Sequence, residues 1–117
     1  MKINVITLDE FCKDRSIEHI NILKIDTEGY DLKVLKGASD VLSKKSIDLI
    51  YTELFFIQPY IEGHLFHEVC SSLYNFGYNL FNIFGVKYTQ NNQLDGVTLC
   101  LLMIDSCRII LKNKKTI

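Results

Sequence analysis

Apolar residues follow two different periods along this chain, and the changes of period divide it into alternating strands and helices. Two runs, residues 19–26 and 47–55, are dense in β-branched and aromatic types, as strands are. The first run ends in polar, turn-forming residues, which predicts a parallel strand buried on both faces at the centre of a sheet. A shorter apolar run at residues 3–6 predicts one more strand.

Helical spacing appears between and after these runs. Apolar residues recur every three or four positions at Leu32, Leu35, Ala38 and Leu42. This spacing predicts one amphipathic helix packed on the sheet. Because a helix would join them, the strands at 19–26 and 47–55 should be parallel, with a right-handed crossover. A second helix is predicted over residues 64–76, with Gly77 in a left-handed conformation after its end.

Different signals mark the two ends of the chain. Thr7 and Glu10 are spaced as a capping box, which predicts a short helix that begins there. Residues 78–84 and 97–104 are strand-like, and the roughly dozen residues between them are too few for a parallel crossover, so an antiparallel hairpin is expected. Residues 108–115 suit a short extra strand with a basic tail, or a solvated end. The whole pattern predicts an α/β fold.

Composition narrows the class of protein further. With 117 residues, 48% of them hydrophobic, the chain should form a single domain over residues 1–117. A formal net charge of −1 does not favour a nucleic-acid partner. No apolar run reaches the roughly 18 residues of a membrane span, and the first residues lack a signal-peptide pattern, which predicts a cytoplasmic protein without a membrane partner.

The four cysteines are Cys12, Cys70, Cys100 and Cys107. They include no closely spaced pair of the kind that holds zinc, so we interpret them as reduced and structural. His64 and His67 are three residues apart and could share a metal with Glu53, which is the weakest of the functional hypotheses. The prediction is therefore of no metal site.

Acidic residues lie where the two predicted parallel strands end. Asp26 and Glu28 follow the first strand, and Glu53 closes the second. Because ligands bind at the carboxyl ends of strands in open α/β sheets, we expect these three carboxylates along one rim as candidate catalytic residues. Asp26 could orient a substrate hydroxyl or act as a general base. Gly29 would let the chain turn tightly into the next helix.

Each of these residues also has a purely structural interpretation. Asp26 and Thr27 are both good helix N-caps. Glu28 would interact favourably with the dipole of the following helix, and Glu53 would simply be exposed at a strand end. From the residues alone, capping is the better supported role for Asp26.

Three segments occur in an order typical of one enzyme family: Thr7-Leu8-Asp9-Glu10-Phe11, then residues 22–31 (ILKIDTEGYD), then Leu35-Lys36-Gly37-Ala38. Glu53 fits a further strand-end acid, and Gly77-Tyr78 fits a Gly-Tyr pair before a later strand. With these motifs the chain, over about residues 5–104, resembles the FkbM family of S-adenosylmethionine-dependent methyltransferases.

The resemblance implies a Rossmann-like class I methyltransferase fold with a seven-stranded sheet whose last strand is antiparallel. It implies S-adenosyl-L-methionine as the methyl donor and O-methylation of a hydroxyl on a sugar or other small molecule. Carried over by position, Asp26 and Glu28 fall beside the donor and acceptor clefts, and Thr27 replaces the family's common Val. Asp26 and Thr27 are thus the candidate cofactor-binding residues.

The resemblance is to the carboxyl-terminal half of such an enzyme only. It implies a partial fold, strands four to seven with two main helices, without the strands that build most of the donor pocket. We therefore expect the chain to be inactive alone. It should take a small-molecule or glycan acceptor, and pair along an exposed sheet edge with the missing amino-terminal half or with itself. The alternative is a non-catalytic remnant, or a binding or oligomerisation module.

Overall fold

The computed structural model describes residues 1–58, 61 and 63–104, with the backbone alone for residues 98–104. In this part of the chain the elements are, in order, α1 (Leu8–Asp14), β1 (Ile20–Ile25), α2 (Asp31–Lys36), α3 (Ser39–Ser43), β2 (Ile47–Phe55), α4 (Phe66–Asn75), β3 (Tyr78–Tyr88) and β4 (Leu94–Ile104). The tail predicted at residues 108–115 lies outside the described residues. Strand β2 has the predicted bounds, and α4 begins two residues later than expected.

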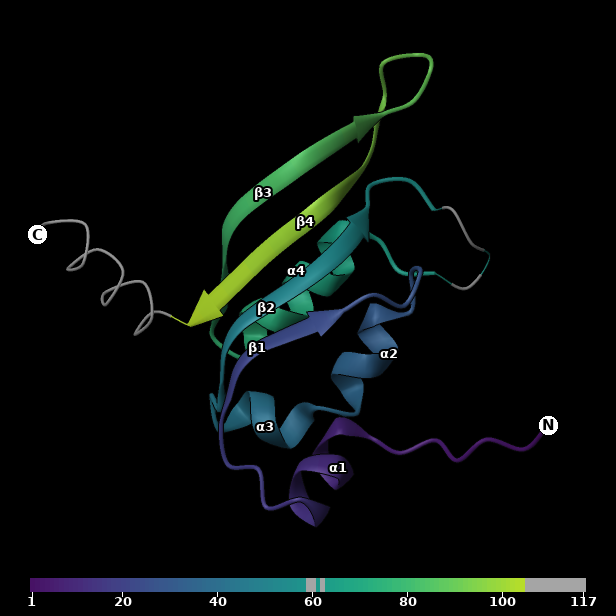
Figure 1. Cartoon of the computed structure of the whole chain (residues 1–117). Helices are drawn as coiled ribbons and strands as arrows, with labels where there is room; N and C mark the ends of the chain where they lie inside the picture. The colour runs from purple at the N-terminus through teal and green to yellow at the C-terminus, as the bar shows by residue number, and fades with distance from the viewer. Residues whose placement is uncertain (59–60, 62, 105–117) are drawn as a thin grey trace, which may run out of the picture.

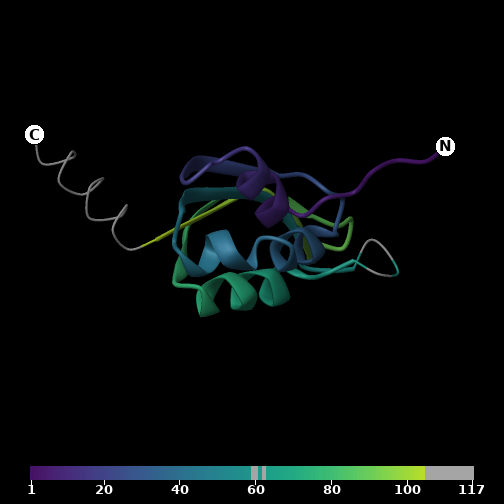
Figure 2. The ribbon, with the colours of Figure 1, turned by 90° about the horizontal axis from the view of Figure 1, so that it is seen from below.

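The strands form one sheet in the order β1-β2-β4-β3 (Figure 1). Strands β1 and β2 are parallel, whereas β4 is antiparallel to both β2 and β3. Helices α2, α3 and α4 lie together on one side of the sheet (Figure 2). The α/β class, the parallel pair and the antiparallel hairpin are therefore confirmed.

No helix among the described residues has both the length and the apolar character needed to cross a membrane.

Strand β1 is parallel as predicted, but the predicted burial of both its faces is wrong, because Ile22 is 62% exposed. Within the described residues β1 lies at an edge of the sheet and pairs only with β2, as expected for a partial fold with an exposed sheet edge. The strand predicted over residues 3–6 is also wrong, because no strand in the described part of the chain pairs with that segment, and Ile3 and Val5 are exposed.

The single helix predicted from the leucine spacing is two helices, α2 and α3, with a break at Gly37. The break lets α1 approach closely. A Cβ on Gly37 would lie 3.2 Å from the Cβ of Thr7, and the amide of Asp9 donates to the carbonyl of Gly37 at 3.0 Å. The Asp9 carboxylate then accepts hydrogen bonds from the amides of Asp40 and Val41, at 2.9 and 3.0 Å. One continuous helix would have no free amides there for Asp9 to cap.

The predicted start of α1 and the predicted left-handed glycine after α4 are confirmed. The Thr7 hydroxyl accepts from the amide of Glu10 at 3.1 Å, and the Glu10 carboxylate accepts from the amide of Thr7 at 2.9 Å. Gly77 has φ +87°, the left-handed conformation expected after α4. These local signals depend on neighbouring residues only, which is why the sequence reveals them.

The core lies between the sheet and its helices. Its fully or almost fully buried side chains include Leu35, Leu42, Ile47, Ile50, Leu54, Leu73 and Tyr78. Tyr78 begins β3, and its hydroxyl donates to the carbonyl of Ile47 at 2.8 Å. This bond ties the first residue of β3 to the first residue of β2, so the amino end of the parallel pair is firmly packed.

Candidate functional site

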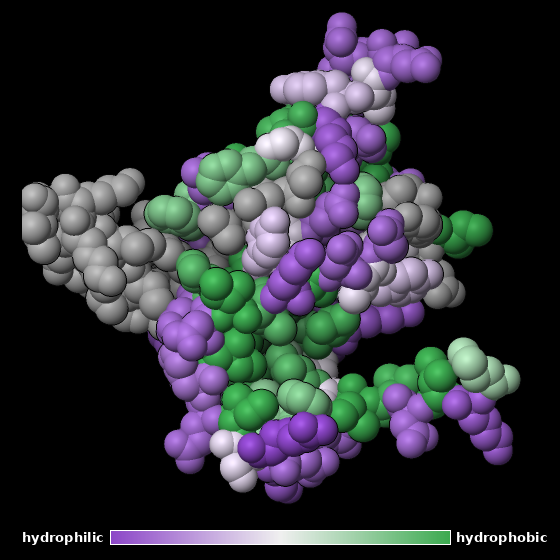
Figure 3. Space-filling view, viewed as in Figure 1, coloured by the Kyte–Doolittle hydropathy of each residue, from purple (hydrophilic) through white to green (hydrophobic). Residues whose placement is uncertain are grey.

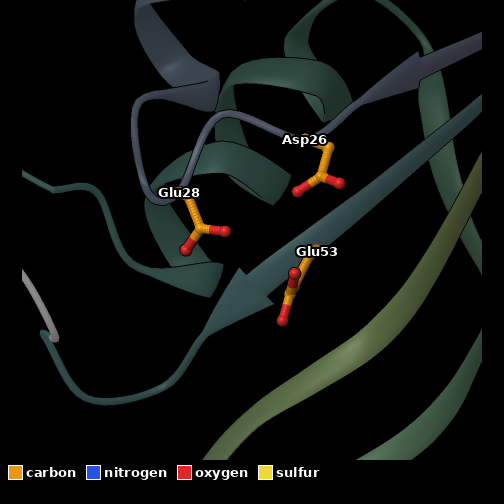
Figure 4. Close-up of side chains that lie close together, drawn as sticks. All are labelled: Asp26, Glu28 and Glu53. Carbon is orange, nitrogen blue, oxygen red and sulfur yellow. The ribbon is translucent and has the colours of Figure 1, made fainter.

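The structure brings the three predicted carboxylates together at the carboxyl ends of β1 and β2. Oxygen atoms of Asp26, Glu28 and Glu53 lie within 4.8 Å of one another. Figure 4 shows the three side chains converging on the space between the loop after β1 and strand β2. The parallel register, with Ile25 beside Thr52, sets this arrangement because it brings the ends of the two strands level. We call these three residues the acidic rim; their chemical roles stay predictions.

The loop that carries two of the rim residues makes a tight turn. Glu28 has φ +54° and Gly29 has φ +96°, so two successive residues are left-handed. The predicted turn at Gly29 is therefore confirmed. The carbonyl of Gly29 accepts from the amide of His64 at 2.8 Å, which joins this loop to the segment before α4.

The capping roles considered for Asp26 and Thr27 are wrong. The N-cap of α2 is Tyr30, whose side chain makes no capping hydrogen bond. The Thr27 hydroxyl donates instead to the side chain of Asp31. Because the turn at Glu28 and Gly29 separates Asp26 from the helix, that carboxylate is left exposed at the rim.

Glu53 has a partner that sequence reasoning missed. Lys87, on β3, places its Nζ 2.8 Å from Oε1 of Glu53. This hydrogen bond raises the pKa of Lys87, with further contributions from the charges of Asp95 and Glu28. The pairing of β2 with β4 is irregular between Thr52 and Leu54, so Glu53 lies at a β-bulge. The simple-exposure interpretation of Glu53 is therefore wrong.

Asp31 is the second residue that sequence reasoning missed. Its side chain is only 2% exposed, and its carboxylate accepts hydrogen bonds from the hydroxyls of Thr27 and Thr52. Burial raises the pKa of Asp31, while the two hydroxyl bonds act in the opposite direction. A signal was present in the sequence, because Asp31 stands four residues before Leu35 on the buried stripe of the helix.

A small cavity of about 140 Å³ opens beside the rim. It is lined by Lys24, Ile25, Asp26, Tyr51, Thr52 and Glu53. The Nζ of Lys24 lies 5.8 Å from the centre of the Tyr51 ring, a cation–π arrangement. Polar side chains gather over this part of the molecule in Figure 3, whereas apolar side chains gather toward the amino ends of β1 and β2.

A wider hollow of about 710 Å³ lies at the other end of these strands, between α1 and α3. Four of its six charged side chains already have local partners. Asp9 caps α3, Glu10 bonds to Thr7, and Asp40 pairs with Lys44 at 2.9 Å. Most of the charge in this hollow therefore serves the fold, whereas the acidic rim lies at the strand ends where ligands bind, so the rim is the better candidate site.

The histidines do not join the rim. Among the described residues, the only group of three spaced to share a metal is Asp26, Glu28 and Glu53, so His64 and His67 do not meet Glu53 as ligands. The metal hypothesis built on those two histidines is thus wrong. Glu53 moreover already carries the Lys87 ammonium as its counter-ion.

The fold and the site together define an α/β protein with ionisable groups gathered at the carboxyl ends of its parallel strands, where such proteins bind small molecules. The methyltransferase FkbM domain matches residues 1–80, and the chain belongs to that family. The match includes α1 to α4 and the whole acidic rim, and it ends before Lys87. Searches of curated proteins and of solved structures gave no match.

Proposed function

We propose that this chain forms the acceptor side of an S-adenosylmethionine-dependent O-methyltransferase that acts on a hydroxyl of a sugar or other small molecule. The observation that carries the proposal is the acidic rim, three carboxylates within 4.8 Å of one another inside a methyltransferase domain. An alcohol is a weak nucleophile at neutral pH. A carboxylate within hydrogen-bond reach can orient it and accept its proton as the new bond forms.

Asp26 is the residue that we assign to that proton transfer. It is exposed at the rim and lines the small cavity, so an acceptor hydroxyl can reach it. Glu53 is held in place by Lys87 and suits a binding role for a second hydroxyl of the acceptor. Glu28 projects from the left-handed turn beside Asp26 and Glu53, and completes the acidic rim.

The negative charge of the rim suits the cationic methyl donor, but the cavity beside the rim is too small to enclose it. When bound, the donor supplies an electrophilic methyl group on a cationic sulfur. Asp26 would hold part of it, since a carboxylate suits a cation. Thr27 does not line the cavity and its hydroxyl donates to Asp31, so we assign it no contact with the donor. A cavity of about 140 Å³ is small beside the roughly 300–1,000 Å³ of ordinary ligand pockets. We infer that the described residues supply only part of the donor site.

The rest of the donor site would lie along β1. In the described residues this strand pairs with β2 alone, so one line of its backbone amides and carbonyls has no strand beside it. We infer that β1, β2, β3 and β4 correspond to strands four to seven of the family's sheet. The order β1-β2-β4-β3 supports this, because the last strand is inserted antiparallel between two others. Further strands would pair with β1 and complete the pocket.

Calorimetric titration of the pure chain with S-adenosylmethionine tests the incomplete pocket. We expect no saturable heat, because the cavity is too small to enclose the donor. Saturable binding in the micromolar range would show that the described residues make a working donor site by themselves.

Transfer of labelled methyl groups to a panel of sugars and other alcohols tests the chemistry, in the chain supplemented with a donor-binding half. Asp26→Asn should lower turnover by about 100-fold or more, since a general base contributes about 10²–10⁴-fold. The matched control is Asp48→Asn. Asp48 lies on β2 outside the rim, and its carboxylate pairs with His19 at 3.0 Å. Equal turnover in the two variants would refute the role of Asp26.

The second candidate function is a non-catalytic module that associates through β1. Ile22 favours it, because this apolar side chain is 62% exposed on an edge strand, and such edges recruit other chains. Sedimentation should then show self-association that Ile22→Lys abolishes. A monomer that binds no second copy would exclude this candidate.

A further inference from the structure

A buried polar network lies directly beneath the acidic rim. Asp31 is the first residue of α2, and its side chain is 2% exposed. It is the only charged side chain among the buried residues that the structure describes. Because a carboxylate is costly to bury, a position of this kind calls for a physical explanation.

The two oxygens of this carboxylate have different partners. Oδ1 accepts from the hydroxyl of Thr27, in the loop after β1, and Oδ2 accepts from the hydroxyl of Thr52, on β2. Thr27 stands between Asp26 and Glu28 in the sequence, and Thr52 immediately precedes Glu53. Successive side chains of a strand point to opposite faces, so Thr52 is buried while Glu53 reaches the rim.

The Asp31 carboxylate connects the rim loop to β2 beyond the point where the sheet does so. The backbone pairing of β1 with β2 ends at Ile25 and Thr52, so residues 26–30 lie beyond the ladder. The Thr27–Asp31–Thr52 network joins this loop to β2, and the bond from the His64 amide to Gly29 joins it to the segment before α4.

Helix capping does not account for Asp31. The N-cap of α2 is Tyr30, and its side chain makes no capping bond. An apolar residue at this position would extend the buried side of α2 next to Leu35 without any desolvation cost. What an apolar residue would lose is the connection between the two segments that carry the rim.

We propose that Asp31 is a positioning residue of the candidate site: its carboxylate, held by the Thr27 and Thr52 hydroxyls, sets the distance between Glu53 and the loop that carries Asp26 and Glu28. The catalytic consequence rests on the proposed function, whereas the positioning itself does not. A displacement of about 1 Å in a catalytic group can cost about 100-fold in rate, so this connection matters to a transfer reaction.

Amide hydrogen exchange of the full chain, followed by NMR, tests the positioning. Thr27→Val and Thr52→Val each remove one hydroxyl and keep the shape of the side chain, and Thr27→Ser and Thr52→Ser restore the hydroxyl. The reporters are the amides of Tyr30, bonded to the Thr27 carbonyl, and of His64, bonded to Gly29. We expect at least tenfold faster exchange at both reporters in each valine variant, and wild-type rates in each serine variant.

The amide of Leu73, buried in α4, separates local from global effects in the same spectra. If exchange at Tyr30 and His64 stays at the wild-type rate, or rises only in step with Leu73, the positioning role is wrong. Where the valine variant at position 52 unfolds, Thr27→Val decides, because Thr27 is only half buried.

Kinetics of the supplemented enzyme distinguish this proposal from the proposed function. If both hold, Thr27→Val lowers kcat about tenfold or more with little change in acceptor KM, and Thr27→Ser restores it. Faster loop exchange in a protein that transfers no methyl group in any form would support the positioning and overturn the methyltransferase assignment. Unchanged kcat with faster exchange would overturn the catalytic consequence.

Discussion

The two ends of the parallel pair β1–β2 are held together in different ways. At the amino end, the amide of Ile20 donates to Ser46 at 2.8 Å, and the hydroxyl of Tyr78 bonds to both backbone groups of Ile47, at 2.8 and 3.3 Å. Tyr78 and Ile47 are both 0% exposed. Close apolar packing and satisfied hydrogen bonds between neutral groups hold this end, with the His19–Asp48 pair at its surface.

The carboxyl end instead buries one carboxylate and gathers three more. Asp31 connects the strands through two hydroxyls, and the acidic rim stands above it. Like charges within 5 Å repel, and a buried charge is costly, so this end adds less stability than the other. The difference indicates that the amino end contributes more to the stability of the fold, and the carboxyl end is where we propose that a ligand binds.

The largest effect is expected at the amino end. Tyr78→Ala removes a fully buried aromatic side chain and should lower the free energy of unfolding by about 3–5 kcal/mol, measured by urea denaturation. Tyr78→Phe keeps the ring, loses the bonds to Ile47, and should cost about 1–3 kcal/mol. A Tyr78→Ala protein as stable as the wild type would contradict the idea that this end anchors the sheet.

A change in pH should act at the carboxyl end through Asp31. Its pKa in the folded protein is raised above 3.8, so the folded state holds the proton more tightly than the unfolded state. The stability that Asp31 contributes is therefore fully present below about pH 3.8 and is lost as the pH rises through the raised pKa. It amounts to about 1.4 kcal/mol for each unit of the increase.

Urea denaturation of wild type and Asp31→Asn across the acid range measures this effect. The stability of the wild type relative to Asp31→Asn should fall as the pH increases, and the comparison of wild type with Asp48→Asn serves as the control. A relative stability that grows with pH would mean that the hydroxyl bonds outweigh burial.

The smallest effect is expected for the ion pair at the rim. Lys87 and Glu53 have side chains that are 47% and 28% exposed, and pairs of this kind contribute about 0–1 kcal/mol. Lys87→Met should therefore change stability by less than about 1 kcal/mol, and less still at high salt, while Lys87→Arg should match the wild type. A loss of several kcal/mol would show that the rim stabilises the fold after all.

Much of the fold was predictable because its signals are local. The bounds of β2, the capping box at Thr7 and Glu10, and the left-handed Gly77 each depend on residues close in sequence. The three acids of the rim were predictable as well, since parallel strands place their carboxyl ends at one edge of a sheet.

What sequence reasoning missed depends on contacts between distant segments. Lys87 reaches Glu53 because β3 extends four residues further than predicted and continues to pair with β4. The break at Gly37 reflects the approach of α1, and the connection of Asp31 to Thr52 spans from α2 to β2. The exposure of Ile22 was missed because the hydrophobic pattern of a run does not reveal whether both faces of its strand are covered.

The contact between Gly37 and Thr7 has a consequence for how this domain can vary. The Thr-Leu-Asp segment and the Leu-Lys-Gly-Ala segment look like two separate motifs, yet the Asp9 amide bonds to the Gly37 carbonyl at 3.0 Å and the Asp9 carboxylate bonds to α3. A Cβ on Gly37 would lie 3.2 Å from the Cβ of Thr7. Substitutions in one segment should therefore be tolerated only with matching substitutions in the other. A chimaera that takes α1 from one relative and the α2–α3 junction from another should fold only when both positions of this contact come from the same parent.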